Sequence, residues 1–143
     1  MIRAVLSDWG HTLFDTAGSV DFLERWAAER CITPEPGRLA RLYREAFARS
    51  RRPEELAKGR DLSAERHREC WLTIFAGIDE QLPGTAEALY AFETSAAGWV
   101  PFPDTEHFML ELRRRGVPLV IVSDVPFDLR PILAHYGLDD LVH

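Results

Sequence analysis

Two polar residues follow apolar segments, at positions where their side chains could do chemistry. Asp8 comes directly after the apolar residues 2–7, and Ser123 comes directly after the apolar residues 117–122. A carboxylate can act as a nucleophile or bind a cation. A hydroxyl group at the start of a helix lies beside amide hydrogens that attract anions. Together these two side chains predict a site for a phosphate group.

The elements expected to position these side chains are two strands. Each segment is a short, continuous apolar run, which is typical of parallel strands that are covered on both faces. Helices are predicted over 104–115, before the second strand, and over 127–136, after it. This order predicts an α/β fold with a Rossmann-like parallel sheet. Such sheets bind ligands at the carboxyl ends of their strands, where both polar residues would lie.

Apolar residues at helical spacing fill the sequence between the two strands. Breaks at residues 34–37 and 82–84 divide this segment into helices. We therefore expect an α-helical cap domain of residues 17–98, inserted into an α/β core domain of residues 1–16 and 99–143. The core domain is partial, because these residues hold only the first two strands of the sheet.

The composition is that of a globular protein, with 46% hydrophobic and 28% charged residues. The formal net charge of −6 argues against a nucleic-acid partner, since such proteins neutralise phosphates with basic residues. No apolar stretch approaches the ~20 residues that span a bilayer. An acid as early as Asp8 does not fit a signal peptide, so we expect none. We expect a cytoplasmic protein that binds no membrane. Its two cysteines, Cys31 and Cys70, form neither a disulfide framework nor a metal-binding pattern.

Three stretches resemble the haloacid dehalogenase superfamily of hydrolases, specifically the members with a helical cap after the first strand. The first motif of that family, usually DxDGTL, is similar to AVLSDWGHTLFDT at residues 4–16. The second motif is similar to LVIVSD at residues 119–124, and residues 103–116 resemble the helix that leads into it. The resemblance covers both ends of the chain, while the cap matches by position and helical character.

The resemblance implies a Mg²⁺-dependent hydrolase of a small phosphorylated metabolite. Asp8 would be the catalytic nucleophile and form an aspartyl-phosphate, which water then hydrolyses. The Asp8 carboxylate and the backbone carbonyl of Gly10 would bind the metal, which screens the repulsion between carboxylate and phosphate. Ser123 would be catalytic through hydrogen bonds to the phosphoryl oxygens. Thr12 would hold the loop after Asp8 and help to orient the phosphate.

Two further residues are predicted at the substrate site. Trp9, next to the nucleophile, is expected to line the substrate entrance. Asp124, in the second motif, is expected near the phosphate, but an acid at that place repels the phosphate. Capping of the helix that follows is the alternative role for Asp124.

Position 10 departs from the family pattern, because Gly10 replaces the acid that normally protonates the leaving group. A positioned acid or base supplies about 10²–10⁴-fold in rate. Either another group such as His11 replaces that acid, or the protein cleaves a phosphonate or a haloacid, since such relatives also lack the acid. A non-catalytic member that binds a phosphorylated ligand or a protein is the third alternative. Lys58, as a Schiff-base lysine, favours phosphonate chemistry, whereas a solvated charged face is its simpler interpretation.

The lysine of the family's third motif and the acidic metal ligands of its fourth motif find no match in the sequence. Asp139 and Asp140 are not assigned to that acidic pair, because they directly follow the predicted second helix. A core of two strands leaves sheet edges uncovered. We therefore expect a longer protein to carry the later motifs and these 143 residues alone to have little or no activity. Self-association into a homodimer would be one way to cover the exposed faces.

Overall fold

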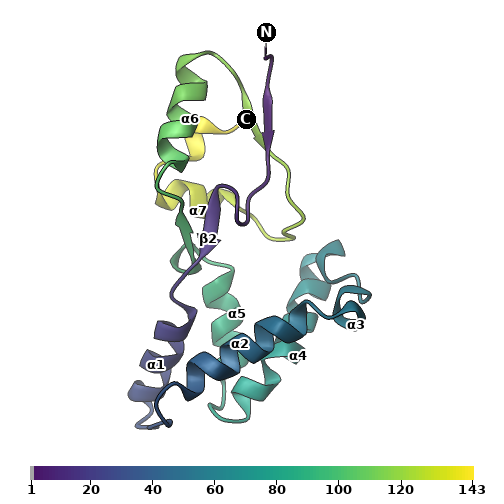
Figure 1. The fold of residues 1–143 in the computed structure, drawn as a ribbon, viewed down its shortest axis with the longest axis vertical. Coiled ribbons are helices and arrows are strands. Elements are labelled where there is room, and N and C mark those ends of the chain that lie inside the picture. The colour runs from purple at the N-terminus through teal and green to yellow at the C-terminus, as the bar shows by residue number, and fades with distance from the viewer. Residues whose placement is uncertain (1) are drawn as a thin grey trace. The chain divides into compact units, whose positions relative to one another are not determined.

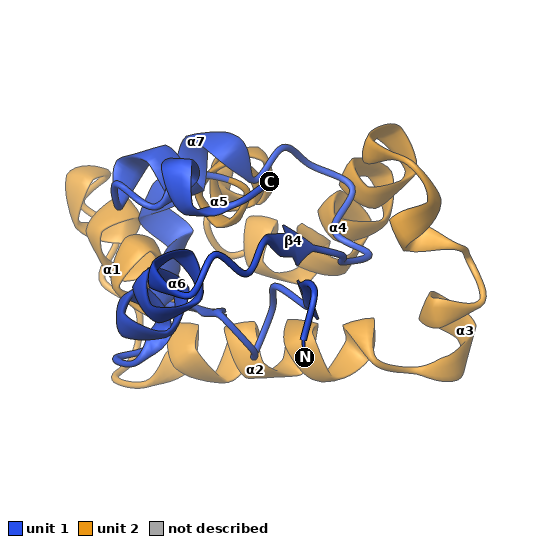
Figure 2. Cartoon of the chain, turned by 90° about the horizontal axis from the view of Figure 1, so that it is seen from above, with its two compact units in different colours: residues 1–17, 95–143 blue, residues 18–94 orange. Residues whose placement is uncertain are grey.

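The chain packs around two separate apolar cores, and the computed structural model describes residues 2–143 (Figure 1). It forms two compact units (Figure 2): unit 1 comprises residues 1–17 and 95–143, and unit 2 comprises residues 18–94. The sequence predicts these boundaries after residues 16 and 98. Residues 95–98 join unit 1 because Ala96 contacts its apolar core.

A parallel pair of strands in unit 1 brings the two predicted polar residues to one edge. β1 (Val5–Ser7) pairs with β4 (Leu119–Ile121) in parallel. The pairing continues past β4, because the N–H of Val122 donates to the carbonyl of Ser7 at 2.8 Å. Asp8 and Ser123 therefore follow the carboxyl ends of neighbouring strands. The predicted α/β fold with a parallel sheet is confirmed, although both strands are shorter than the apolar runs that contain them.

A second pair of strands lies where the chain passes between the units. β2 (Phe14–Thr16) pairs with β3 (Trp99–Pro101) in antiparallel orientation. The N–H of Ala17 donates to the carbonyl of Gly98 at 3.0 Å and extends this ribbon by one hydrogen bond. The ribbon is not predictable from the sequence, because strands of three residues are too short for a periodic pattern.

The helices of unit 1 flank β4 in the predicted order. α6 (Thr105–Arg114) precedes β4, and α7 (Arg130–His135) follows it. The Thr105 hydroxyl donates to the carbonyl of Leu13 at 2.6 Å, which ties the start of α6 to the loop after β1. Short 3₁₀ helices, η2 (Ala96–Gly98) and η3 (Asp139–Leu141), complete the unit.

Trp9 belongs to the apolar core of unit 1. Its side chain is 0% exposed and stacks on Phe14, with 4.0 Å between the ring centroids. The ring centroid of Trp99 lies 5.6 Å away. The other buried residues of this core are Leu13, Met109, Leu119, Ile132, Leu133, Leu138 and Leu141. The residue next to Asp8 is thus anchored in the core, which fixes the backbone at the end of β1.

Unit 2 is helical, as the apolar spacing predicts. Its longer helices are α1 (Ser19–Glu29), α2 (Arg38–Ser50), α4 (Ala64–Asp79) and α5 (Thr85–Glu93). Helices α2 and α5 both pack against α4, and α1 packs against α2 and α5. Their apolar faces meet in one core, whose fully buried members include Leu23, Phe75, Ile78, Leu82 and Leu89. Two short elements, α3 (Pro53–Leu56) and η1 (Arg60–Leu62), connect α2 to α4.

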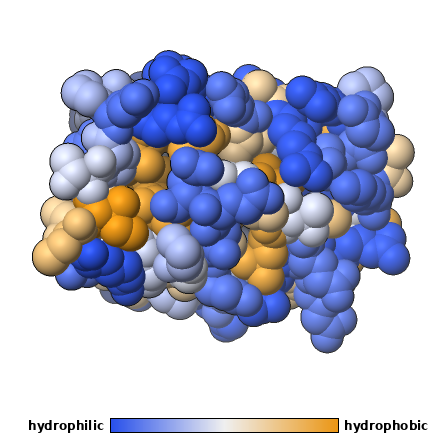
Figure 3. Space-filling model, turned by 90° about the horizontal axis from the view of Figure 1, so that it is seen from below, coloured by the Kyte–Doolittle hydropathy of each residue, from blue (hydrophilic) through white to orange (hydrophobic). Residues whose placement is uncertain are grey.

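Hydrophilic side chains cover most of the face drawn in Figure 3, with smaller apolar areas between them. Ile2, Leu6 and Val122, in or beside the strands of the parallel pair, are between 60% and 72% exposed. Within the described part of the chain, no helix combines the length and apolar character that a bilayer crossing requires.

Candidate functional site

The loop after β1 turns back on itself directly after Asp8. The carbonyl of Trp9 accepts hydrogen bonds from the N–H groups of Leu13 and Phe14, at 2.9 and 3.1 Å. The N–H of His11 donates to the carbonyl of Phe14 at 2.7 Å. His11 has a φ of 57°, a left-handed conformation that histidine adopts more readily than most other residues. This turn buries the side chain of Trp9 and leaves the side chain of Asp8 exposed beside it.

The carboxylate of Asp8 is held through one oxygen and open at the other. Its Oδ1 accepts the N–H of Trp9 at 2.7 Å, and the hydroxyl of Ser7 donates to the Asp8 carbonyl at 3.0 Å. Among the described residues, no side chain or amide donates to Oδ2. An exposed carboxylate oxygen without a donor can attack an electrophile or bind a cation.

The backbone carbonyl of Gly10 is also open. The amide hydrogens of the turn go to Trp9 and Phe14, so within the described chain none of them reaches the Gly10 oxygen. A Cβ added at Gly10 would meet Trp99 at 3.9 Å, which is an ordinary van der Waals contact. The site therefore has room for a side chain at position 10.

Asp8 and Gly10 together fit part of a magnesium site. Mg²⁺ prefers oxygen ligands, keeps several waters and typically binds through one or two carboxylates plus the phosphate of a substrate. Residues 2–143 contain no cluster of three or more Asp, Glu, His or Cys side chains that could hold a metal. The carboxylate and the carbonyl would therefore supply two ligands, with water and phosphate among the others.

The second predicted residue, Ser123, is half-buried at the end of β4. It lines a pocket of about 270 Å³ together with Asp128, Arg130 and His143. The helix after β4 begins only at Arg130, so Ser123 is not at a helix N-terminus as the sequence predicts. Its hydroxyl is thus available at the same sheet edge as Asp8, without the expected dipole of an adjoining helix.

Asp124 is exposed and does not cap the helix that follows. The N–H of Arg130, in the first turn of α7, donates to Oδ1 of Asp128 at 3.0 Å. The capping role predicted for Asp124 is therefore wrong, because residues 125–129 form a loop between the second motif and α7 and bring Asp128 to the helix start.

Trp9 does not lie where the sequence predicts it, whereas Thr12 lies in the loop after Asp8 as expected. The structure places the Trp9 side chain in the core, at 0% exposure, and not at a substrate entrance. An aromatic ring that stacks on Phe14 gains more from burial than from exposure beside a polar site. Thr12 is exposed, and its N–H donates to the carbonyl of Trp9 at 3.3 Å, within the turn that follows Asp8.

Asp15 is a neighbour of the site that apolar patterning and motif spacing do not predict. Its Oδ1 lies 3.0 Å from Nδ1 of His11 and also accepts the N–H of Thr16 at 2.9 Å. Asp15 lies in β2, so a strand positions the carboxylate that holds the imidazole of His11. The spacing of four residues is the only sequence signal for this pair, and it becomes informative only once the turn is known.

Lys58 lies in unit 2 and forms an ion pair with a buried acid. Its Nζ is 2.6 Å from Oε2 of Glu55, and Oε1 of Glu55 is 3.1 Å from Nε of Arg49. A lysine that forms a Schiff base needs an amine that is free to attack a carbonyl group, whereas the Nζ of Lys58 is engaged by the Glu55 carboxylate. The ion pair supports the interpretation of Lys58 as part of a charged surface, and phosphonate chemistry loses the residue that favoured it.

Replacing Glu55→Gln should make unit 2 less stable at neutral pH. The hydrogen bond from Lys58 lowers the pKa of Glu55 below its ordinary value of 4.5; burial opposes the shift and Arg49 adds to it. An acid with a lowered pKa stabilises the fold above its unfolded pKa, and this contribution is lost as the pH falls through the folded pKa. We expect the variant to lose about 1–3 kcal/mol in free energy of unfolding at pH 7 and less at pH 4.

Urea denaturation followed by circular dichroism at both pH values measures this difference. The matched control is Glu54→Gln, because Glu54 is an exposed acid of the same short helix. Equal losses in the two variants, or a loss for Glu55→Gln that does not change with pH, would contradict the assignment.

Comparisons with known proteins agree with this fold. Residues 5–143 match the family model of the haloacid dehalogenase-like hydrolases. A solved structure, a HAD phosphatase from Thermococcus onnurineus, is similar with a TM-score of 0.51 and 20% sequence identity. The match covers 99% of this chain and 60% of that one, and at this identity it shows the fold alone. No curated protein matches the sequence. With nearly its whole length matched by the family model, the chain belongs to the haloacid dehalogenase-like hydrolases.

Proposed function

We propose that the protein is a Mg²⁺-dependent hydrolase of a small phosphorylated metabolite, with Asp8 as the nucleophile. The observation that carries this proposal is the Asp8 carboxylate, exposed at the carboxyl end of β1 with Oδ1 held by the Trp9 amide. Membership of the hydrolase family supports the same assignment.

The geometry of Asp8 suits attack on phosphorus. Oδ2 forms a bond to phosphorus while the bond to the leaving oxygen breaks, which gives an aspartyl-phosphate. The amide of Trp9 keeps the carboxylate from rotating, which holds the attacking oxygen in place. Ser123, at the end of the neighbouring strand, donates its hydroxyl to a phosphoryl oxygen. Water then hydrolyses the aspartyl-phosphate and regenerates Asp8.

Asp8 and Gly10 would hold the metal ion through the carboxylate and the backbone carbonyl. Bound Mg²⁺ supplies positive charge that screens the repulsion between the carboxylate and the phosphate. The protein itself supplies the two oxygens. Within the described chain, neither Oδ2 of Asp8 nor the carbonyl oxygen of Gly10 accepts a hydrogen bond from the turn at residues 9–14.

Glycine at position 10 restricts the substrate class. Without an acid there, the leaving oxygen receives no proton from that position, and only a leaving group of low pKa departs readily. We therefore assign the protein to phosphorylated metabolites with such leaving groups, for example acyl phosphates. The same glycine is the one observation that favours the alternative, a non-catalytic member that binds a phosphorylated ligand.

Metal removal tests the proposed function. We expect the full-length protein to hydrolyse p-nitrophenyl phosphate with Mg²⁺ present, because its leaving group has a low pKa. Chelation with EDTA should abolish this activity, and added Mg²⁺ should restore it. Activity that persists unchanged in EDTA would contradict the metal dependence. An absence of hydrolysis with Mg²⁺ present, together with saturable binding of inorganic phosphate, would favour the non-catalytic alternative.

A further inference from the structure

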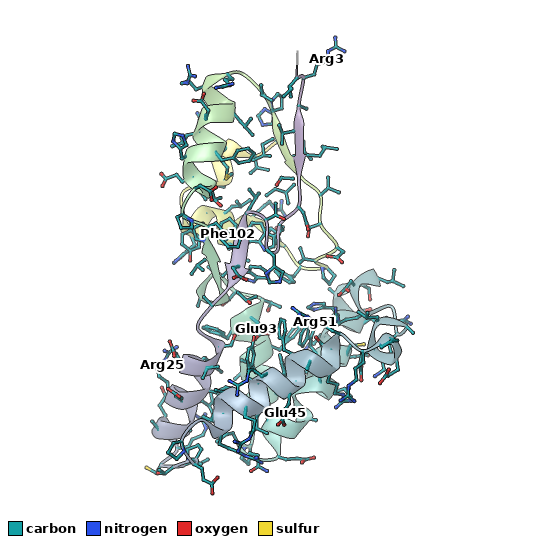
Figure 4. All side chains as sticks on the ribbon, viewed as in Figure 1. Arg3, Arg25, Glu45, Arg51, Glu93 and Phe102 are labelled. Atoms are coloured by element: carbon teal, nitrogen blue, oxygen red, sulfur yellow. The ribbon has the colours of Figure 1, made fainter. Side chains whose placement is uncertain are left out.

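A buried histidine of unit 2 lies among polar side chains from three elements. His67, in α4, is 8% exposed. Its Nδ1 lies 3.0 Å from the hydroxyl of Tyr90, in α5, and its Nε2 accepts the indole N–H of Trp71, in α4, at 3.0 Å. Oδ1 of Asp61, in η1, lies 3.9 Å from the same Nε2. Figure 4 labels Glu93, which follows Tyr90 at the end of α5.

The hydrogen bond from Trp71 determines where the neutral imidazole of His67 carries its proton. An indole N–H can only donate, so Nε2 must hold a lone pair. The ring proton therefore lies on Nδ1, from which it is donated to the hydroxyl of Tyr90. In this state the ring is uncharged, and Nε2 has no proton to donate to Asp61.

We propose that His67 is a proton-operated switch within unit 2, whose Nε2 exchanges Trp71 for Asp61 as its hydrogen-bond partner when a proton is added. A proton from the solvent binds the lone pair of Nε2 and forms an N–H bond there. This N–H cannot face the N–H of Trp71, because both groups are donors. The carboxylate of Asp61 accepts it instead, while Nδ1 keeps its hydrogen bond to Tyr90. The charge of one imidazole thus sets whether η1 is bound to α4 through Asp61.

The surroundings of His67 allow this exchange. Asp61 is half-buried, and its Oδ1 needs to move by only about 1 Å to come within hydrogen-bond distance of Nε2. Trp71 is also half-buried, so water can accept the indole N–H that His67 releases. The guanidinium of Arg60 lies 5.1 Å from the ring centroid of Trp71, and its Nη1 donates to the carbonyl of Ser50 at 3.1 Å. These contacts hold the indole ring in place in both states.

Charged groups on the elements packed against α4 act on His67 with opposite signs. The carboxylate of Asp61 favours the protonated ring, whereas Arg60, which pairs with Asp61 at 3.0 Å, opposes it. Tyr90 is a neutral partner, because burial raises its pKa more than the charge of Arg68 lowers it. Three further arginines of α2 and α4 bond elsewhere: Arg49 to Glu55, Arg66 to the carbonyl of Lys58, and Arg68 to Glu87.

Nuclear magnetic resonance of the full-length protein tests the proposal through the indole N–H of Trp71. We expect this resonance, assigned by its absence in Trp71→Phe, to move as the pH falls from about 8 to about 5, where histidine changes charge. Its midpoint should equal that of the His67 ring, whose proton should lie on Nδ1 at the upper pH. Trp26 is the internal control, because its Nε1 has no hydrogen-bond partner in the described chain and its resonance should not move.

Asp61→Asn tests the second partner of the switch. An opposite charge within about 4–6 Å shifts a protonation equilibrium by about 1–3 pH units, and the partial exposure of Asp61 favours the lower end. We therefore expect the midpoint to fall by about one pH unit. The matched control is Asp21→Asn, at an exposed aspartate of α1, which should leave the midpoint unchanged. In His67→Gln, the Trp71 resonance should no longer depend on pH in this range.

The proposal would be overturned by a Trp71 resonance that does not move over this pH range, or by a proton on Nε2 of His67 at the upper pH. An unchanged midpoint in Asp61→Asn, or movement of the resonance that persists in His67→Gln, would overturn it as well. The measurements on the unsubstituted protein and on Asp61→Asn decide the question even if His67→Gln does not fold. None of them involves Asp8, so their results do not depend on the hydrolase assignment.

Discussion

Asp8→Asn should lower the hydrolysis of p-nitrophenyl phosphate by at least about 10³-fold, which is the scale of effect when a catalytic residue is removed. The amide of asparagine has nearly the shape of the carboxylate, and its side-chain oxygen can still accept the N–H of Trp9. The loop after β1 should therefore keep its structure, since the Trp9 ring remains buried. The variant would lose the negative oxygen that, in the proposed mechanism, attacks phosphorus and binds the metal.

Steady-state kinetics with saturating Mg²⁺ measures this loss. Asp104→Asn makes the same chemical change at an exposed aspartate before α6, whose side chain makes no capping hydrogen bond, and should retain full activity. A tenfold or smaller loss in Asp8→Asn, or a similar loss in the control, would show that Asp8 is not the nucleophile.

Gly10→Asp should raise the rate of phosphate-ester hydrolysis. It supplies a proton donor where the family pattern has one, and a positioned acid is worth about 10²–10⁴-fold in rate. The substitution is structurally feasible, because an added Cβ would lie 3.9 Å from Trp99. The gain should be greatest for phenyl phosphate, whose leaving group needs a proton, and smaller for p-nitrophenyl phosphate.

Gly10→Asn is the control for the added side chain, since asparagine has a similar size and supplies no acid. A gain in Gly10→Asp that Gly10→Asn does not reproduce is the expected result. Equal activities in the two variants would mean that position 10 does not limit the reaction. No gain from Gly10→Asp, together with a neutral Asp8→Asn, would contradict the hydrolase assignment as a whole.

The fold is predictable where the sequence repeats a physical pattern over several residues. The apolar runs that contain β1 and β4 predict parallel strands, and helical spacing predicts α1, α2, α4 and α5. The pairing of β2 with β3 was not predictable in this way. Each of these strands has three residues, and their partners lie far apart in the sequence. Only the folded unit brings Phe14 opposite Pro101.

The candidate site is predictable in part, for a related reason. Asp8 and Ser123 follow apolar strands, and the parallel register brings them to one sheet edge. The roles of Trp9 and Asp124 are inferred from their neighbours in the sequence, whereas the positions of their side chains depend on local turns. The turn after β1 directs Trp9 into the core, and the loop before α7 gives the hydrogen bond at the helix start to Asp128. Such turns depend on individual hydrogen bonds, which the spacing of apolar residues in the sequence does not predict.

The most direct test of the central claim is to find the phosphoryl group on Asp8. The full-length protein would be mixed with p-nitrophenyl phosphate and Mg²⁺, quenched in acid within milliseconds, digested and analysed by mass spectrometry. We predict that the peptide containing Asp8 gains the mass of one phosphoryl group, and that the Asp8→Asn variant gains none. Turnover without any phosphoryl group on that peptide, or the same modification in Asp8→Asn, would contradict the account.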